Sequence, residues 1–188
     1  MSRKSPARSR ILETATRLFY TEGVHAVGID RIIAEAGVAK ATFYHHFPAK
    51  DVLVQAYVEE QSRLQQEAAA QLPEAAPRDT LLAVFAHMGE VGVSPDFRGC
   101  PFINAAAEYP DPAHPVRQTI DEHRRWFREL VRDLLALAGD PDAGRTADIL
   151  VLVRDGLAVG CDLDAPAGLQ ALVRDAVIRV LDGAGARV

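Results

Sequence analysis

A glycine at position 37 separates two short segments with helical apolar spacing, and this arrangement restricts the fold of the N-terminal part more than any other feature. Ile29, Ile32 and Ile33 recur at the spacing of one helix face, which predicts a short amphipathic helix before the glycine. Glycine adopts a left-handed backbone without steric cost, so the chain can turn sharply into a second helix that begins near Ala39. The stretch therefore predicts a helix-turn-helix.

The second of these helices has one apolar and one polar face. Phe43 and Phe47 lie four residues apart and are expected to point together into a core, and Pro48 ends the helix. Groups on the opposite face can reach phosphates and base edges when the helix lies in the major groove of DNA. The residues predicted to contact DNA are Arg31, Lys40, Ala41, Thr42, Tyr44, His45 and Lys50. The alternative is an ordinary solvated helical hairpin, which has the same spacing.

The sequence around this turn resembles a known signature. Residues 37–50 read GVAKATFYHHFPAK, and a helical pattern that opens at Arg10 and closes at Gly23 precedes them. The turn glycine, Thr-Phe-Tyr and His-Phe-Pro-x-Lys fall in the register of TetR-type transcriptional regulators, which the first 57 residues resemble. Residues 99–108, GCPFINAAAE, resemble one subgroup of these regulators. The resemblance implies a dimer whose two recognition helices enter successive major grooves about 34–36 Å apart, and an effector bound among C-terminal helices.

The pattern along the chain predicts an all-α fold of two domains. Residues 1–50 form a three-helix DNA-binding domain with the helix-turn-helix, and residues 51–188 form a larger helical effector-binding and dimerisation domain. No alternating apolar pattern predicts a strand. The helices expected after the first domain cover residues 50–72, 78–91, 101–108, 115–138, 142–161 and 165–182, separated by segments rich in Gly and Pro.

The charge of the chain is polarised. Its overall charge is −5, which is unusual for a nucleic-acid binder. Residues 1–50, however, carry eight Lys or Arg and four Asp or Glu, a charge of +4, whereas the remainder carries 13 and 22, a charge of −9. A basic end that faces DNA and an acidic body that stays away from it would allow an acidic protein to bind a phosphate backbone. A basic tail without a role is the alternative.

The sequence predicts a cytoplasmic protein without a metal or cofactor. No segment approaches the roughly 18 apolar residues of a membrane span. Cys100 and Cys161 show no metal-type spacing and are expected to be free thiols. Four residues from separate segments lack the spacing of a ligand set, namely His87, Glu108, His114 and His123.

The last two predicted helices have apolar surfaces too wide for one neighbour to cover. They are expected to form half of a four-helix bundle across a two-fold axis, which would make the protein a homodimer. The predicted interface residues are Ile149, Val153, Gly156, Leu157, Gly160, Leu169, Val173, Val177 and Val180. Packing of this hairpin on its own domain is the alternative.

The middle helices mix aromatic and polar side chains, a composition typical of a small-molecule pocket. The residues expected to contact an unknown effector are Tyr57, Phe85, Met88, Cys100, Ile103, Asn104, Glu108, His123, Trp126 and Phe127. In the alternative these residues belong to a core, in which Asn104 and Glu108 bind backbone groups of the loop near residues 110–115 and His123 is a satisfied core histidine.

These features together favour a dimeric, ligand-responsive repressor that binds a palindromic DNA operator. Cys100 opens a predicted helix, where backbone N–H groups favour a thiolate, so a thiol-based redox or electrophile sensor is one alternative. A helical enzyme is another, but the sequence has no nucleophile motif or phosphate-binding loop to support it.

Overall fold

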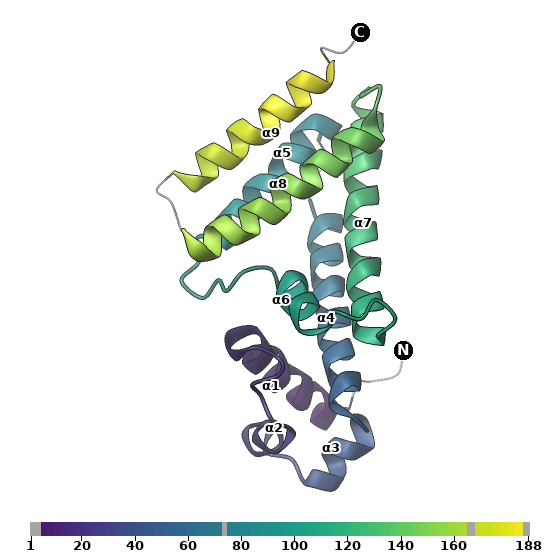
Figure 1. Ribbon diagram of the computed structural model, residues 1–188, viewed down its shortest axis with the longest axis vertical. Helices are drawn as coiled ribbons and strands as arrows, with labels where there is room; N and C mark the ends of the chain where they lie inside the picture. Colours follow the sequence, from purple (N-terminus) through teal and green to yellow (C-terminus); the bar gives the residue numbers. More distant parts are fainter. Residues whose placement is uncertain (1–4, 73–74, 165–167, 186–188) are drawn as a thin grey trace. The chain divides into compact units, whose positions relative to one another are not determined.

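The computed structural model of the protein describes residues 5–72, 75–164 and 168–185. These residues form nine α-helices and no β-strand, which confirms the all-α prediction (Figure 1). The helices are α1 (Pro6–Glu22), α2 (Ile29–Ala36), α3 (Lys40–His46), α4 (Lys50–Ala70), α5 (Pro77–Gly92), α6 (Pro101–Glu108), α7 (Pro115–Leu137), α8 (Ala143–Leu163) and α9 (Leu169–Gly185). The helix break expected after residue 72 and the helix start expected at residue 165 fall on residues outside the described ranges.

The chain divides into two compact units whose boundaries are not simply sequential. The first unit comprises residues 1–65 and 101–121, and the second comprises residues 66–100 and 122–188. The first unit therefore contains α6 and the start of α7 in addition to the three N-terminal helices and most of α4. The proposed functional boundary at residue 50 stays a prediction, because the compact units describe packing and not function.

The core of the first unit is built by the inward faces of its N-terminal helices. Phe43 and Phe47 are fully buried, as their spacing predicts, with ring centroids 6.2 Å apart. Helices α1, α2 and α3 pack against one another around them. Other fully buried side chains of these helices and of early α4 include Ile11, Ala15, Leu18, Ile32, Leu53 and Val54. Burial of each large side chain contributes about 1.5–3 kcal/mol, so α3 is held by its phenylalanines.

The turn between α2 and α3 has the conformation that the glycine predicts. Gly37 has φ 61° and ψ 44°, which is the left-handed region. Its N–H and that of Val38 donate to the carbonyls of Ala34 and Ile33, so the last turn of α2 is closed. Ala39 is extended, and α3 begins at the next residue.

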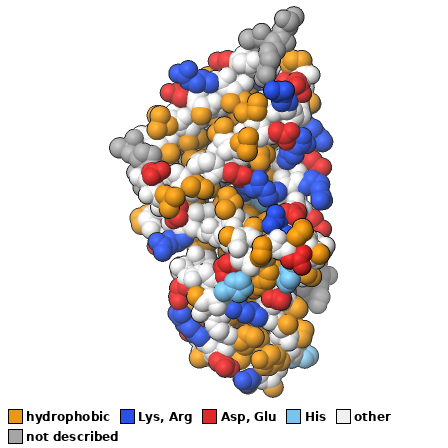
Figure 2. Space-filling view, viewed as in Figure 1, with side chains coloured by type: hydrophobic (Ala, Val, Ile, Leu, Met, Phe, Trp, Pro, Cys, Tyr) orange, Lys and Arg blue, Asp and Glu red, His pale blue; other side chains and the backbone are white. Residues whose placement is uncertain are grey.

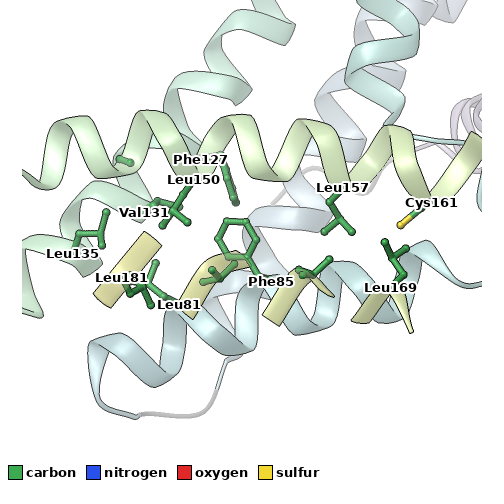
Figure 3. Close-up of a cluster of buried hydrophobic side chains, with 13 residues drawn as sticks. Leu81, Phe85, Phe127, Val131, Leu135, Leu150, Leu157, Cys161, Leu169 and Leu181 are labelled. Carbon is green, nitrogen blue, oxygen red and sulfur yellow. The ribbon is translucent and has the colours of Figure 1, made fainter. Parts of the chain in front are cut away.

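The second unit has a continuous apolar core between α5, α7, α8 and α9. Figure 3 shows Phe85 of α5, Phe127 of α7 and Leu157 of α8 pointing into the same cluster. Gly92 allows α5 to approach α8, since a Cβ at this position would lie 2.2 Å from Cys161 Sγ. Thirteen residues form the cluster: Leu81, Phe85, Phe127, Val131, Leu135, Ala147, Leu150, Leu157, Cys161, Leu169, Val173, Val177 and Leu181.

Candidate functional site

Helix α3 has an exposed polar face, and buried phenylalanines lie on its opposite side. Because Phe43 and Phe47 point inward, the rest of the helix faces solvent: Lys40, Ala41, Tyr44 and His45 are exposed, and Thr42 is half-buried. Lys50, the first residue of α4, is half-buried. This face carries an ammonium, a hydroxyl, a phenol and an imidazole, groups that can contact DNA phosphates and bases.

Ion pairs within the first unit hold two of the residues predicted to contact DNA. Lys40 Nζ lies 3.2 Å from Asp30 Oδ1, and this hydrogen bond raises the pKa of Lys40. Arg31 donates to Glu22 and to Glu35, with Nε 2.8 Å from Glu35 Oε1. Exposed pairs of this kind contribute about 0–1 kcal/mol each. A phosphate can therefore replace these carboxylates at little cost to the fold.

The carboxylate of Glu108 binds the loop that follows α1. Its Oε1 accepts from Val24 N–H at 2.7 Å and its Oε2 from His25 N–H at 2.5 Å, while His25 Nδ1 lies 3.0 Å from Oε2. Both oxygens are occupied by the protein itself. The alternative, a carboxylate that satisfies loop backbone groups, describes Glu108 only in part, because the loop is the one after α1 and not residues 110–115. The expected effector contact of Glu108 stays a prediction.

A second set of contacts joins the segment after α6 to the start of α4. Tyr109 donates to Asp51 Oδ1 at 2.9 Å, and His114 Nε2 lies 3.4 Å from Asp51 Oδ2. The ring of Tyr109 stacks on that of His25, with centroids 5.6 Å apart, and the His114 ring lies tilted to it by 42°, with centroids 4.7 Å apart. Burial, followed by the bond to Asp51, raises the pKa of Tyr109, so the phenol stays protonated as a donor.

The predicted effector residues are divided between the two units. Four lie in the first unit, where Tyr57 packs edge-to-face on Phe19 with centroids 5.8 Å apart. Helix α6 buries Phe102 and Ala105, whereas Ile103 is half-buried and Asn104 is exposed, and the expected effector contacts of these two residues stay predictions. The six in the second unit are Phe85, Met88, Cys100, His123, Trp126 and Phe127.

Arg154, which the sequence reasoning missed, connects several of these second-unit residues. Its guanidinium carbon lies 5.0 Å from the centroid of the Phe127 ring, and Nη2 lies 3.6 Å from Cys100 Sγ. The side chain is almost completely buried. A signal was present in the sequence, because position 154 falls at helical spacing in the apolar stripe of Leu150, Leu157 and Cys161.

His123 is buried next to this arginine and is neutral. Burial first, and then the charges of Arg154 and Arg124, lower its pKa to about 3. Its ring lies 5.3 Å from that of Trp126. A neutral imidazole can donate and accept hydrogen bonds but cannot neutralise a carboxylate.

The low pKa of His123 predicts an acid-dependent loss of stability. Between about pH 6.5 and pH 3 the unfolded chain binds a proton that the folded protein does not, so the free energy of unfolding falls with decreasing pH by about 1.4 kcal/mol per unit. From pH 7 to pH 5 the parent should therefore lose about 2 kcal/mol more than His123→Gln. Urea unfolding at both pH values measures this, and equal losses in the two proteins would contradict it.

The exposed apolar surface of α8 and α9 differs from the predicted interface. Leu157, Leu169, Val173 and Val177 are buried in the core of their own unit, so they offer little surface to a partner, and their assignment to an interface stays a prediction. Figure 2 shows hydrophobic side chains at the surface over these two helices. The exposed face of α8 carries Leu152, Gly156, Val159 and Leu163, and α9 adds Leu172. Ile149, Val153, Gly160 and Val180 are half-buried.

The described residues lack two further features. None of their helices is long and apolar enough to cross a membrane. They contain no cluster of three His, Cys, Asp or Glu residues arranged to hold a metal ion.

Comparison with known proteins places this geometry in a family. The model for bacterial regulatory proteins of the tetR family matches residues 11–57, and the model for the tetracyclin repressor-like C-terminal domain matches residues 77–151. The HTH-type transcriptional regulator LmrA of Bacillus subtilis is 30% identical over 125 residues, which are 64% of this chain and 66% of LmrA. YxaF of the same organism, an uncharacterized HTH-type transcriptional regulator, is 44% identical over 48 residues, 26% of this chain and 25% of YxaF. The chain thus matches less than two thirds of the length of either relative.

Solved structures match over nearly the whole chain. SCO4454, a TetR-family transcriptional regulator from Streptomyces coelicolor, has a TM-score of 0.86 at 44% identity, with 95% of each chain covered. The sav143 protein of Streptomyces avermitilis has a TM-score of 0.87 at 30% identity, with 96% of this chain and 99% of that one covered. Regulators and not enzymes are thus the relatives of this protein. The chain belongs to the TetR family of DNA-binding transcriptional regulators.

Proposed function

We propose that the protein is a dimeric repressor that leaves its operator when a small molecule binds its C-terminal domain. The observation that carries the DNA-binding part is the exposed polar face of α3, fixed by two buried phenylalanines. The positive charge of residues 1–50 supports the same role, and DNA in the cytoplasm is the partner that this charge fits. Arg31 and Lys40 would exchange their carboxylate partners for phosphates.

Selection from random double-stranded DNA tests this proposal without knowledge of the operator. The purified protein should enrich two half-sites related by two-fold symmetry, with centres about 34–36 Å apart. Gel-shift titration of an enriched duplex should show weaker binding by Lys50→Ala, which removes a cation expected to contact phosphate, and a shallower salt dependence. Absence of any enrichment over the starting pool would reject the proposal.

The exposed apolar stripe of α8 supports the dimer. Leu152 and Leu163 are 70% and 73% exposed, and Val159 lies on the same face. Gly156 between them would let a partner helix approach closely. A face of this kind is expected to pack against its copy across a two-fold axis.

A charge on this stripe should separate the subunits. Val159→Asp would place an unpaired carboxylate in the interface, so we expect monomers in sedimentation and weaker operator binding, since two half-sites are no longer bound together. Leu137→Asp is a matched control, because Leu137 is 74% exposed at the end of α7, off the stripe. The control should remain dimeric. A parent protein that sediments as a monomer at micromolar concentration would contradict the interface.

A specific contact favours a second candidate, a thiol sensor. Nη2 of Arg154 lies 3.6 Å from Cys100 Sγ, so oxidation of Cys100 would alter the surroundings of a buried charge. In this case peroxide should release the parent protein from DNA but leave Cys100→Ser bound. Equal release of both proteins would exclude Cys100 as the sensor.

A further inference from the structure

Arg154 is a buried cation in a helix face that otherwise packs into the core. Only 2% of the residue is exposed, and its neighbours on this face of α8 are Leu150 and Leu157. Removal of a guanidinium from water is strongly destabilising unless carboxylates and hydrogen bonds compensate the charge. The groups that surround Arg154 therefore show whether its charge is compensated within the protein or is left for a ligand.

The compensation of this charge within the protein is incomplete. Asp155 is its carboxylate partner, with Nη1 3.0 Å from Asp155 Oδ1. Asp155, however, also accepts both hydrogen bonds of Arg124, at 3.1 Å and 2.6 Å. Two guanidinium groups thus share one carboxylate, and Arg124 already occupies both of its oxygens.

The unsatisfied part of Arg154 is one particular edge of its guanidinium. Nε is buried and has no hydrogen-bond partner among the described residues. Nη2, which forms the same edge, donates to the sulfur of Cys100, and a thiol sulfur is a weak acceptor. Nε–H and Nη2–H are parallel donors that match the two oxygens of a carboxylate.

The surroundings of the guanidinium are aromatic, and the neutral His123 adds no charge to them. Phe127 lies under the guanidinium, and His123 is 5.3 Å from Trp126. Aromatic walls with a few fixed polar groups are typical of sites for small organic molecules. The positive charge of Arg154 requires that a ligand bound here carry a negative charge.

We propose that Arg154 recognises the charge of the effector, and that the effector is an organic anion whose carboxylate binds the Nε–Nη2 edge. An aromatic body on this anion would contact Phe127 and Trp126. The inference rests on the proposed effector-responsive function and specifies the chemistry of its ligand. It concerns the second unit alone, which supplies Cys100, α7 from residue 122 onward and α8.

Benzoate and benzamide test the charge requirement, because they have nearly the same shape and differ in charge. Melting temperatures of the full-length protein are measured with each compound, and sodium chloride keeps the ionic strength constant. We expect benzoate to raise the melting temperature of the parent by a few degrees and benzamide to leave it unchanged. Arg154→Met should lose the benzoate shift, with affinity lowered about tenfold or more.

Two further variants separate recognition from folding. Arg128→Met removes a guanidinium that bridges α7 to Asp148 of α8 at the surface, and it should keep the benzoate shift. Arg154→Lys keeps the charge but removes the planar edge, so its affinity for benzoate should fall as well. Arg154→Met itself should fold, because Asp155 retains Arg124 and no carboxylate is left without a partner.

The outcomes separate this inference from the proposed function. A benzoate shift that persists in Arg154→Met means an adventitious ion only and overturns the inference. A parent that does not respond to benzoate, or that responds equally to benzamide, also overturns it. In each of these cases the parent can still bind its selected DNA, whereas a parent that enriches no DNA rejects the proposed function whatever benzoate does.

Discussion

Phe43→Ala is expected to lower the free energy of unfolding by about 3–5 kcal/mol and to abolish DNA binding. The Phe43 side chain is fully buried, and it contacts Phe47 inside the first unit. Its removal leaves a cavity under α3, and Phe47, which directly follows this helix, is then the buried aromatic side chain that remains there. Urea denaturation measures the loss of stability, and gel shift with the selected DNA measures the loss of binding.

Tyr44→Ala is the matched control on the opposite face of the same helix. Tyr44 is 41% exposed and contacts the edge of Phe43 with ring centroids 5.3 Å apart, so its removal should cost only about 1 kcal/mol of stability. DNA binding should nevertheless become about tenfold weaker if the phenol contacts phosphate. A stable Phe43→Ala protein, or a Tyr44→Ala protein with parental DNA affinity, would contradict the proposed orientation of α3.

Glu108→Leu is expected to destabilise the first unit by about 2–4 kcal/mol. The substitution keeps most of the volume but leaves the N–H groups of Val24 and His25 without their charged acceptor. Water can reach the second of these groups more easily than the first, so the loss is smaller than two full charged hydrogen bonds. Urea unfolding measures the change, and hydrogen exchange should become faster at both amides.

Glu108→Gln is its matched control, because the amide retains one acceptor oxygen and loses the charge. It should lose less stability than Glu108→Leu, and the Val24 amide should stay protected. Parental stability and exchange rates in Glu108→Leu would show that the carboxylate does not hold this loop.

Local pattern was sufficient to predict the helix-turn-helix. The apolar spacing gave the inward direction of Phe43 and Phe47, and the turn glycine has the backbone that the sharp turn needs. These features depend on residues within one or two helical turns. A sequence pattern reports such features directly.

The contacts that the sequence did not predict join distant segments. Glu108 binds residues more than 80 positions away, and no local spacing encodes that contact. In α8, apolar residues cover more than one face, so periodicity alone does not decide which face the same chain buries. The prediction placed Leu157 in an interface, whereas the structure buries it between helices of its own unit. The same face holds Arg154, and a charged residue among buried leucines indicates a specific role.

The discontinuous first unit has a consequence for the construction of chimeric regulators. A fragment that ends at residue 50 or 65 would lack Glu108 and Tyr109, which hold the loop after α1 and the start of α4. In a chimera, positions 108 and 109 would then carry the side chains of the recipient protein. Exchange of DNA specificity between homologous proteins should therefore transfer residues 101–121 together with residues 1–65, as one graft in two pieces.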